Sequence, residues 1–146
     1  MRPLAEAECV FFARQLAGLD PWRSLGFSAA GLEAYLKRED SSVLRSVAVV
    51  EGRLSGLIAL RKPWLRGPYI ELLAVLPESQ GMGIGSLMVD WALEQARPSR
   101  NLWACVSDFN HAARDFYARR GFAEIAPLEG LVSEERAEIL LRRRLP

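Results

Sequence analysis

Residues 72–96 read LLAVLPESQGMGIGSLMVDWALEQA, and this stretch decides the fold. An apolar segment is followed by three alternating glycines, Gly81, Gly83 and Gly85, and a helical apolar period begins at Ile84. This order predicts a strand that turns through glycines into a helix. The first amides of a helix lack internal partners, and the helix dipole adds partial positive charge there. The turn is therefore expected to bind a phosphate or pyrophosphate.

The composition of the whole chain fits one domain, spanning residues 1–146. The net charge of +1 gives no reason to expect a nucleic acid or a membrane as partner. Cys9 and Cys105 each stand in an apolar pattern, so both are expected to be reduced core residues, and no metal site is predicted. Neither a secretory leader nor an apolar stretch of ~20 residues is present, so we expect a cytoplasmic protein.

Periodicity and turn residues predict a mixed α/β domain. Two helices come first, and Ser28 is expected to cap the second. Glu51-Gly52 is expected to form the turn of a β-hairpin. The predicted helices are 5–17, the segment after Ser28, 83–96 and 110–120. The predicted strands are 43–50, 53–60, 69–76, 102–106, 121–125 and 136–143. A loop is predicted at 126–135, between the last two strands.

The spacing of the glycines disfavours two other phosphate-binding motifs. A phosphate-binding loop of the P-loop type needs a lysine directly after its last glycine, and no lysine follows any of these three. A dinucleotide fingerprint needs Gly-x-Gly-x-x-Gly, but Ser86 stands at the third position. A dinucleotide-binding fragment that prefers NAD remains a remote alternative.

Two motifs together resemble the GNAT superfamily of N-acetyltransferases. Residues 80–85, QGMGIG, fit the family pattern Gln/Arg-x-x-Gly-x-Gly/Ala, and the preceding LLAVLPESQG resembles the family's strand and loop. Downstream, NHAARDFYARRGF at 110–122 resembles the family pattern N-x-x-A-x-x-F-Y-x-x-x-G-F. The two motifs occur in the family's order, with a predicted strand between them. The resemblance covers residues 69–125 closely and 43–143 in the order of elements.

The resemblance implies a fold and a cosubstrate. We expect a single GNAT-like domain with a central mixed, mostly antiparallel sheet flanked by about four helices. The cleft would open between the strands at 69–76 and 102–106. Family members usually begin with a short strand before the first helix, for which Met1–Leu4 leave little room. Acetyl-CoA would bind along the cleft through Leu73, Ala74, Val75, Gln80, Gly81, Met82, Gly83, Ile84, Gly85, Ser86, Asn110 and Phe116.

The resemblance also implies catalytic residues. Tyr117 matches the tyrosine that protonates the leaving thiolate, since a phenol of pKa near ~10 can protonate a thiolate of pKa near ~8.5; simple packing beside Phe116 is the alternative. Glu71 is an acid within an apolar strand, where Tyr69, Glu71, Leu73 and Val75 would share one face. Glu71 is predicted to act as general base or substrate anchor, and an ion pair with an arginine is the alternative.

The resemblance predicts an acetyl-CoA-dependent N-acetyltransferase that acts by direct attack of a primary amine in a ternary complex. The acceptor would be a small-molecule amine or a protein N-terminus. It would be selected by residues 19–31, with Trp22 and Phe27, and by the loop at 126–135, whose Glu129, Glu134 and Glu135 suit a cation. The alternatives are a non-catalytic acyl-CoA-binding or sensing module and a covalent route through Cys105. A homodimer is compatible with the sequence.

Overall fold

One sheet with a split at its centre organises the protein. The computed structural model describes residues 1–146. Its seven strands lie in the order β1-β2-β3-β4-β5-β7-β6, and every neighbouring pair is antiparallel except β4 and β5. The mixed, mostly antiparallel sheet predicted from the sequence is therefore confirmed. The strands are β1 (Arg2–Pro3), β2 (Val43–Val50), β3 (Arg53–Arg61), β4 (Tyr69–Val75), β5 (Asn101–Ser107), β6 (Ala123–Glu129) and β7 (Ala137–Arg144).

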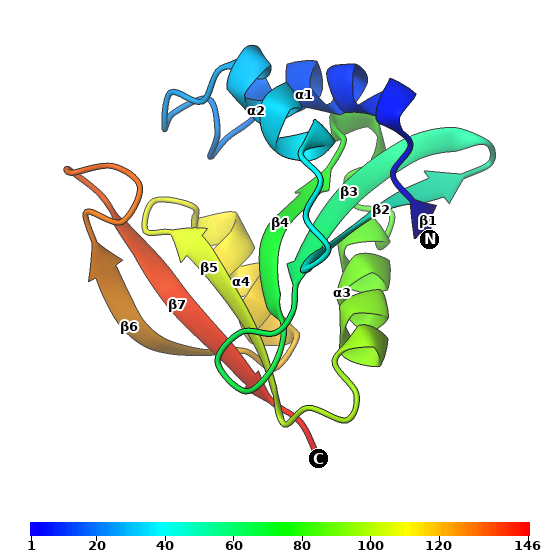
Figure 1. The fold of residues 1–146 in the computed structure, drawn as a ribbon. Helices are drawn as coiled ribbons and strands as arrows, with labels where there is room; N and C mark the ends of the chain where they lie inside the picture. The colour runs from blue at the N-terminus through cyan, green and yellow to red at the C-terminus, as the bar shows by residue number, and fades with distance from the viewer.

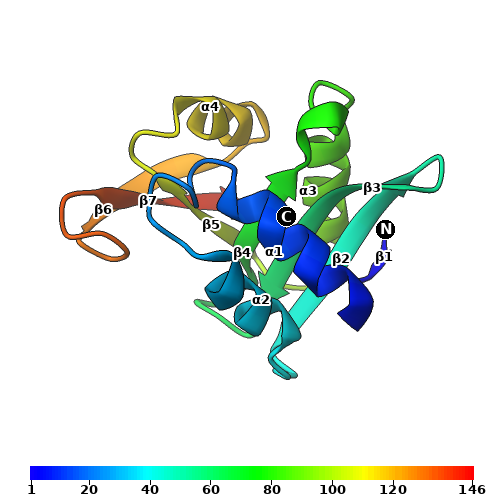
Figure 2. The same cartoon turned by 90° about the horizontal axis from the view of Figure 1, so that it is seen from above.

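The helices cover both faces of this sheet, α1 and α2 on one and α3 and α4 on the other, as Figure 2 shows. Each face buries its own apolar cluster, one centred on Met88 of α3 and one on Phe12 of α1, and both of these side chains are fully buried. No helix combines the length and apolar character that crossing a membrane requires. The helices are α1 (Cys9–Ala17), α2 (Ala29–Lys37), α3 (Ile84–Gln95) and α4 (His111–Arg119), with short 3-10 turns η1 (Glu6–Glu8) and η2 (Pro77–Ser79).

Local sequence signals located most of these elements. The Ser28 hydroxyl accepts a hydrogen bond from the Gly31 amide and caps α2, as predicted. The short first strand is present as β1, which pairs with β2 through two residues. The predicted loop at 126–135 begins too early, because β6 continues to Glu129. Pro127 lies within β6, which is an edge strand, where a residue without an N–H is tolerated.

The split lies between β4 and β5. These two parallel strands pair only at Tyr69–Trp103 and Ile70–Ala104, whereas β5 and β7 stay paired along their length. Figure 1 shows the two halves of the sheet diverging from this point, with α1 and α2 across the open end. Beyond Ile70, the edge of β4 that faces β5 therefore has backbone groups without a strand partner. The predicted cleft between these strands is confirmed.

A β-bulge at Glu71 changes which side chains share a face of β4. Ile70 lies opposite Leu60 and Leu72 lies opposite Ala59, so Glu71 has no partner on β3. An extra residue reverses the alternation beyond it. Leu72 accordingly packs in the cluster of α1 and α2, while Leu73, like Ile70, packs against the cluster of α3 and α4. The expectation that Tyr69, Glu71, Leu73 and Val75 share one face is therefore wrong.

Gly67 shows how tightly the connection before β4 packs. A Cβ atom built on Gly67 would overlap the backbone carbonyl of Asn101, which cannot move without disturbing β5. We expect Gly67→Ala to destabilise the protein by about 3 kcal/mol and to lower Tm by roughly 10 °C in a thermal melt. Gly18→Ala is the matched control, because its Cβ would make only ordinary contacts. Equal Tm values for the two variants would contradict this account.

Candidate active site

The glycine turn leads into the N-terminus of α3. Gly81 and Gly83 have φ angles of 77° and 79°, a conformation that costs glycine little, and Gly83 is the N-cap of α3. A Cβ at either position would meet no protein atom within 4 Å, so this side of the turn is open. It borders a hollow of about 310 Å³, the turn hollow, lined by Val75, Ser79, Gln80, Gly81, Gly83, Ile84, Gly85, Ser86, Phe116 and Arg119.

The third glycine has a packing role. A Cβ on Gly85 would lie 3.2 Å from Cζ of Phe116, closer than ordinary van der Waals contact. Its absence lets α4 approach the start of α3, so the two motifs identified in the sequence meet in space. Arg119, at the end of α4, borders the turn hollow, whereas Arg120 forms an ion pair with Asp90 of α3.

A second cavity of about 220 Å³, the central cavity, lies where β4 and β5 diverge. It is bordered by five of the predicted catalytic and cofactor-binding residues, and Phe116 borders both this cavity and the turn hollow. Phe116 therefore forms a wall that the two spaces share. The predicted site residues on the central cavity are Glu71, Leu73, Asn110, Phe116 and Tyr117, while Met82 and Ala74 border neither space.

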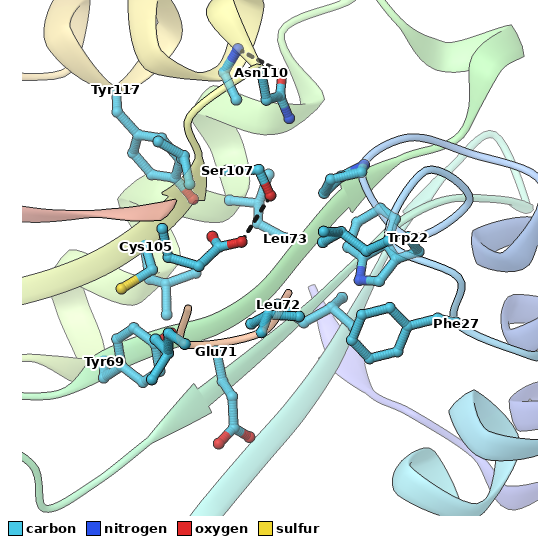
Figure 3. Close-up of a pocket in the computed structure, with 18 of the residues that line it drawn as sticks. Trp22, Phe27, Tyr69, Glu71, Leu72, Leu73, Cys105, Ser107, Asn110 and Tyr117 are labelled. Atoms are coloured by element: carbon cyan, nitrogen blue, oxygen red, sulfur yellow. Dashed lines mark hydrogen bonds between the residues drawn. The ribbon is translucent and has the colours of Figure 1, made fainter. Parts of the chain in front are cut away.

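Tyr117 packs against its aromatic neighbours and also borders the central cavity. Its ring packs edge-on against Phe116 and Phe122, with ring centres 5.3 and 5.0 Å away. Figure 3 shows Tyr117 extending from α4 into the cavity toward β5. Burial, and to a lesser extent the Cys105 thiol, raises the pKa of Tyr117 above its ordinary value. The phenol is therefore protonated at neutral pH and available as a donor.

Asn110 caps α4 and also borders the central cavity. Its side-chain Oδ1 accepts a hydrogen bond of 3.2 Å from the Ala113 amide. The cap uses the carbonyl end of the side chain, so the Nδ2 group remains available as a donor to a ligand.

Glu71 is held by partners on the α2 side of the sheet. Its Oε1 accepts a hydrogen bond from Nε of Arg61 at 2.7 Å, and its Oε2 accepts one from the Tyr35 hydroxyl at 2.6 Å. Burial and the Glu71 carboxylate raise the pKa of Tyr35. In Figure 3 the Glu71 side chain points away from Tyr117 and Ser107. The arginine pair that the sequence left open is present, and the role of Glu71 as a base stays a prediction.

The mouth of the central cavity is more apolar than the sequence suggested. Trp22 and Phe27, from the segment between α1 and α2, border it as expected. Across from them the β6–β7 loop contributes Leu131 and Val132, which are 59% and 47% exposed. The three acids proposed for a cation, Glu129, Glu134 and Glu135, are exposed and do not border this cavity.

One polar residue of the central cavity, Glu138, was missed by sequence reasoning. Ser107 ends β5 and Glu138 lies opposite it on β7, and both are buried. The Ser107 hydroxyl donates a hydrogen bond of 2.8 Å to Oε1 of Glu138, drawn as a dashed line at Ser107 in Figure 3. The one signal available was an acid in the apolar segment AEILL, since an acid in such a segment is costly to bury without a partner.

Both cysteines are free thiols. Cys9 is the first residue of α1 and is buried, and Cys105 borders the central cavity. Burial raises the pKa of the Cys105 thiol, so it is protonated at neutral pH.

Structural comparison places this architecture among known acetyltransferases. An acetyltransferase from Thermus thermophilus superposes with a TM-score of 0.79 at 16% identity, covering 99% of this chain and 95% of that one. A spermidine N-acetyltransferase from Vibrio cholerae, solved with CoA and spermine, superposes with a TM-score of 0.76 at 18% identity. This match covers 98% of the present chain and 93% of that one. A nourseothricin acetyltransferase superposes with a TM-score of 0.68 at 27% identity, covering 74% of the present chain and 68% of that one. Because the first two structures are only 16% and 18% identical to this chain, their similarity shows the fold alone.

Sequence comparison identifies the family. An Escherichia coli K12 protein described as the uncharacterized N-acetyltransferase YjhQ is 32% identical over 118 residues, which are 74% of this chain and 63% of that protein. This chain thus matches less than two thirds of that relative's length. The sequence model of the Acetyltransferase (GNAT) family matches residues 7–122, which include both motifs and the central cleft. The chain therefore belongs to the GNAT family of acetyltransferases.

Proposed function

We propose that this protein transfers the acetyl group of acetyl-CoA to a primary amine by direct attack in a ternary complex. The observation that carries the proposal is that the turn hollow and the central cavity share Phe116 as a lining residue, so the glycine turn and Tyr117 border neighbouring spaces. A pyrophosphate at the N-terminus of α3 directs the pantetheine arm from the turn hollow toward the central cavity. The thioester then lies beside Tyr117, in the split between β4 and β5.

The cosubstrate is held mainly by backbone groups. The amides of residues 80–85 bind the pyrophosphate, and Arg119 is placed to add a charge-assisted contact. The Nδ2 group of Asn110 binds the pantetheine arm. The unpaired edge of β4, in the region of residues 73–75, supplies an amide that stabilises the oxyanion formed by attack on the thioester.

The chemistry needs a proton for the departing sulfur. Tyr117 donates it, since the phenol is protonated at neutral pH and extends into the cavity. The raised pKa of Tyr117 makes it a weaker acid, but the same apolar surroundings also raise the pKa of a thiolate that forms there. The protonated Cys105 thiol supports direct transfer over an acetyl-cysteine intermediate.

The acceptor is an amine by analogy with the relatives. The names of two structural neighbours specify nourseothricin and spermidine as acceptors of those proteins. For the present chain, the apolar mouth formed by Trp22, Phe27, Leu131 and Val132 fits a small-molecule amine or a peptide N-terminus with an apolar side chain.

Ligand-induced stabilisation tests the cosubstrate. Thermal melts are run in parallel with acetyl-CoA, CoA, NAD and ATP. A ligand at 100 times its Kd stabilises the folded state by about 2.7 kcal/mol, which corresponds to a rise in Tm of roughly 5–10 °C for a domain of this size. We expect this rise with acetyl-CoA and with CoA. A rise with NAD alone, or no rise with either form of CoA, would overturn the proposal.

A further inference from the structure

Glu138 is one of two acids that border the central cavity, and Glu71 is the other. Glu138 is 8% exposed, lies on β7 directly opposite Ser107 of β5, and borders the cavity together with Tyr117 and Cys105. A carboxylate in such surroundings is costly unless a donor or a cation compensates its charge. Ser107 provides one hydrogen bond, to Oε1 at 2.8 Å. The second oxygen, Oε2, is left for a ligand.

Glu71 differs from Glu138 in how many of its carboxylate oxygens already accept a hydrogen bond. Both oxygens of Glu71 accept hydrogen bonds, from Arg61 and from Tyr35. Arg61 itself is held further by the Ser42 hydroxyl at 2.8 Å and by Asp40 at 3.3 Å. Taking a proton from a substrate would break up this network, so Glu71 is poorly placed to act as a base. Of the two acids on the cavity, Glu138 is the one without a cation.

We infer that Glu138 binds the ammonium group of the acceptor in the central cavity and takes its proton before attack, with Ser107 positioning the carboxylate. This inference rests on the proposed acetyltransferase function. It adds a second catalytic residue to Tyr117 and assigns Ser107, which acts only through Glu138, as a positioning residue.

The same geometry defines the acceptor class. Glu138 can neutralise a single positive charge, while Trp22, Phe27, Leu131 and Val132 offer only apolar surface toward the mouth. A second ammonium group on the acceptor would lose water there without gaining a partner. The acceptor is therefore a compound with one primary amine and an apolar substituent, and a polyamine is a poor substrate.

The proton balance is complete with these two residues. Glu138 takes one proton from the ammonium, and the neutral nitrogen then attacks the thioester carbonyl carbon to form the C–N bond. When the C–S bond breaks, the sulfur takes the Tyr117 proton, and the new amide nitrogen loses its extra proton. Of the two protons released from nitrogen, one restores Tyr117 and the other leaves to solvent as Glu138 is reset.

The pH dependence follows from the surroundings of Glu138. Burial raises the pKa of the Glu138 carboxyl, the Ser107 hydrogen bond lowers it, and the nearby Asp108 carboxylate raises it. Tyr69 from β4 and Cys105 from β5 also face it, and both stay neutral because burial raises their pKa values. Only ionised Glu138 can accept the proton, so kcat/KM rises with pH through this pKa.

Turnover and binding measurements on the full chain test the inference. The acceptor probes are benzylamine, 2-phenylethylamine and hexylamine, with spermidine for comparison. We expect Glu138→Gln to lower kcat/KM for the monoamines by about a hundredfold and to abolish the acidic limb of the pH profile. Its Kd for acetyl-CoA and its Tm remain close to wild type. Glu129→Gln, an exposed acid on β6, is the matched control and is expected to leave both kcat/KM and the pH profile unchanged.

Two further variants separate catalysis from structure. Ser107→Ala keeps the carboxylate but removes the bond that lowers its pKa, so the acidic limb is expected to move to higher pH. This readout stands even if Glu138→Gln folds poorly. Glu71→Gln breaks the pair with Arg61 and is expected to retain the acidic limb. Loss of that limb in Glu71→Gln, with the limb intact in Glu138→Gln, overturns the inference and assigns the base to Glu71.

The wild-type protein separates this inference from the proposed function. Absence of acetyl-CoA binding overturns both. Acetyl-CoA binding with turnover of spermidine but of none of the monoamines overturns the inference alone, as does turnover of the monoamines that Glu138→Gln leaves unchanged. Acetyl-CoA binding without turnover of any probe also overturns the inference, because the acceptor class is then wrong.

Discussion

Tyr117→Phe is expected to lower kcat by about a hundredfold with saturating acetyl-CoA and acceptor. The substitution removes only the hydroxyl that extends into the central cavity, while the ring keeps its edge-on contacts with Phe116 and Phe122. The sulfur then leaves as a thiolate without a proton donor. The readouts are steady-state kinetics for kcat and calorimetric titration for the Kd of acetyl-CoA.

The Kd and the Tm serve as internal controls for this variant. Both are expected to stay close to wild type, since the phenyl ring fills the same volume. A non-catalytic acyl-CoA sensor would bind acetyl-CoA equally well before and after the substitution and would show no turnover in either protein. Unchanged kcat in Tyr117→Phe would remove Tyr117 from the mechanism, and a parallel loss of acetyl-CoA binding would make its role structural.

Gly83→Val is expected to raise the Kd of acetyl-CoA by about a hundredfold, because losing two charge-assisted hydrogen bonds costs ~3 kcal/mol or more. Gly83 caps α3 with a left-handed φ of 79°, which a β-branched residue avoids. The side chain would also enter the open space beside the turn, where we propose that the pyrophosphate binds. Calorimetric titration with acetyl-CoA measures the change.

Gly52→Val is the matched control for this prediction. Gly52 has a φ of 76°, and a Cβ there would meet no atom within 4 Å, so the backbone strain of the two substitutions is alike. Gly52 lies in the turn between β2 and β3, outside both spaces of the cleft. We expect both variants to lose similar stability and only Gly83→Val to lose affinity. Equal Kd values for the two variants would exclude the turn as the pyrophosphate site.

The sequence determined the elements and the cosubstrate end of the site, because their signals are local. The alternating glycines report a backbone that must adopt positive φ and expose its amides, and these properties belong to the turn itself. The Ser28 cap and the Glu51-Gly52 turn are similarly read from neighbouring residues, and the structure confirms them.

Only the tertiary structure reveals the lining of the central cavity, where we propose that the acceptor binds, because this lining depends on register and on packing between distant segments. The bulge at Glu71 arises from the pairing of β4 with β3 and reverses the faces beyond it, which no count of period two within β4 reveals. Glu138 meets Ser107, 31 residues earlier in the chain, only because β7 pairs with β5 in one register. Leu131 and Val132 face the α1–α2 segment for the same reason. Sequence patterns report a residue's own backbone and period, whereas a cavity is defined by which distant strands and loops come together around it.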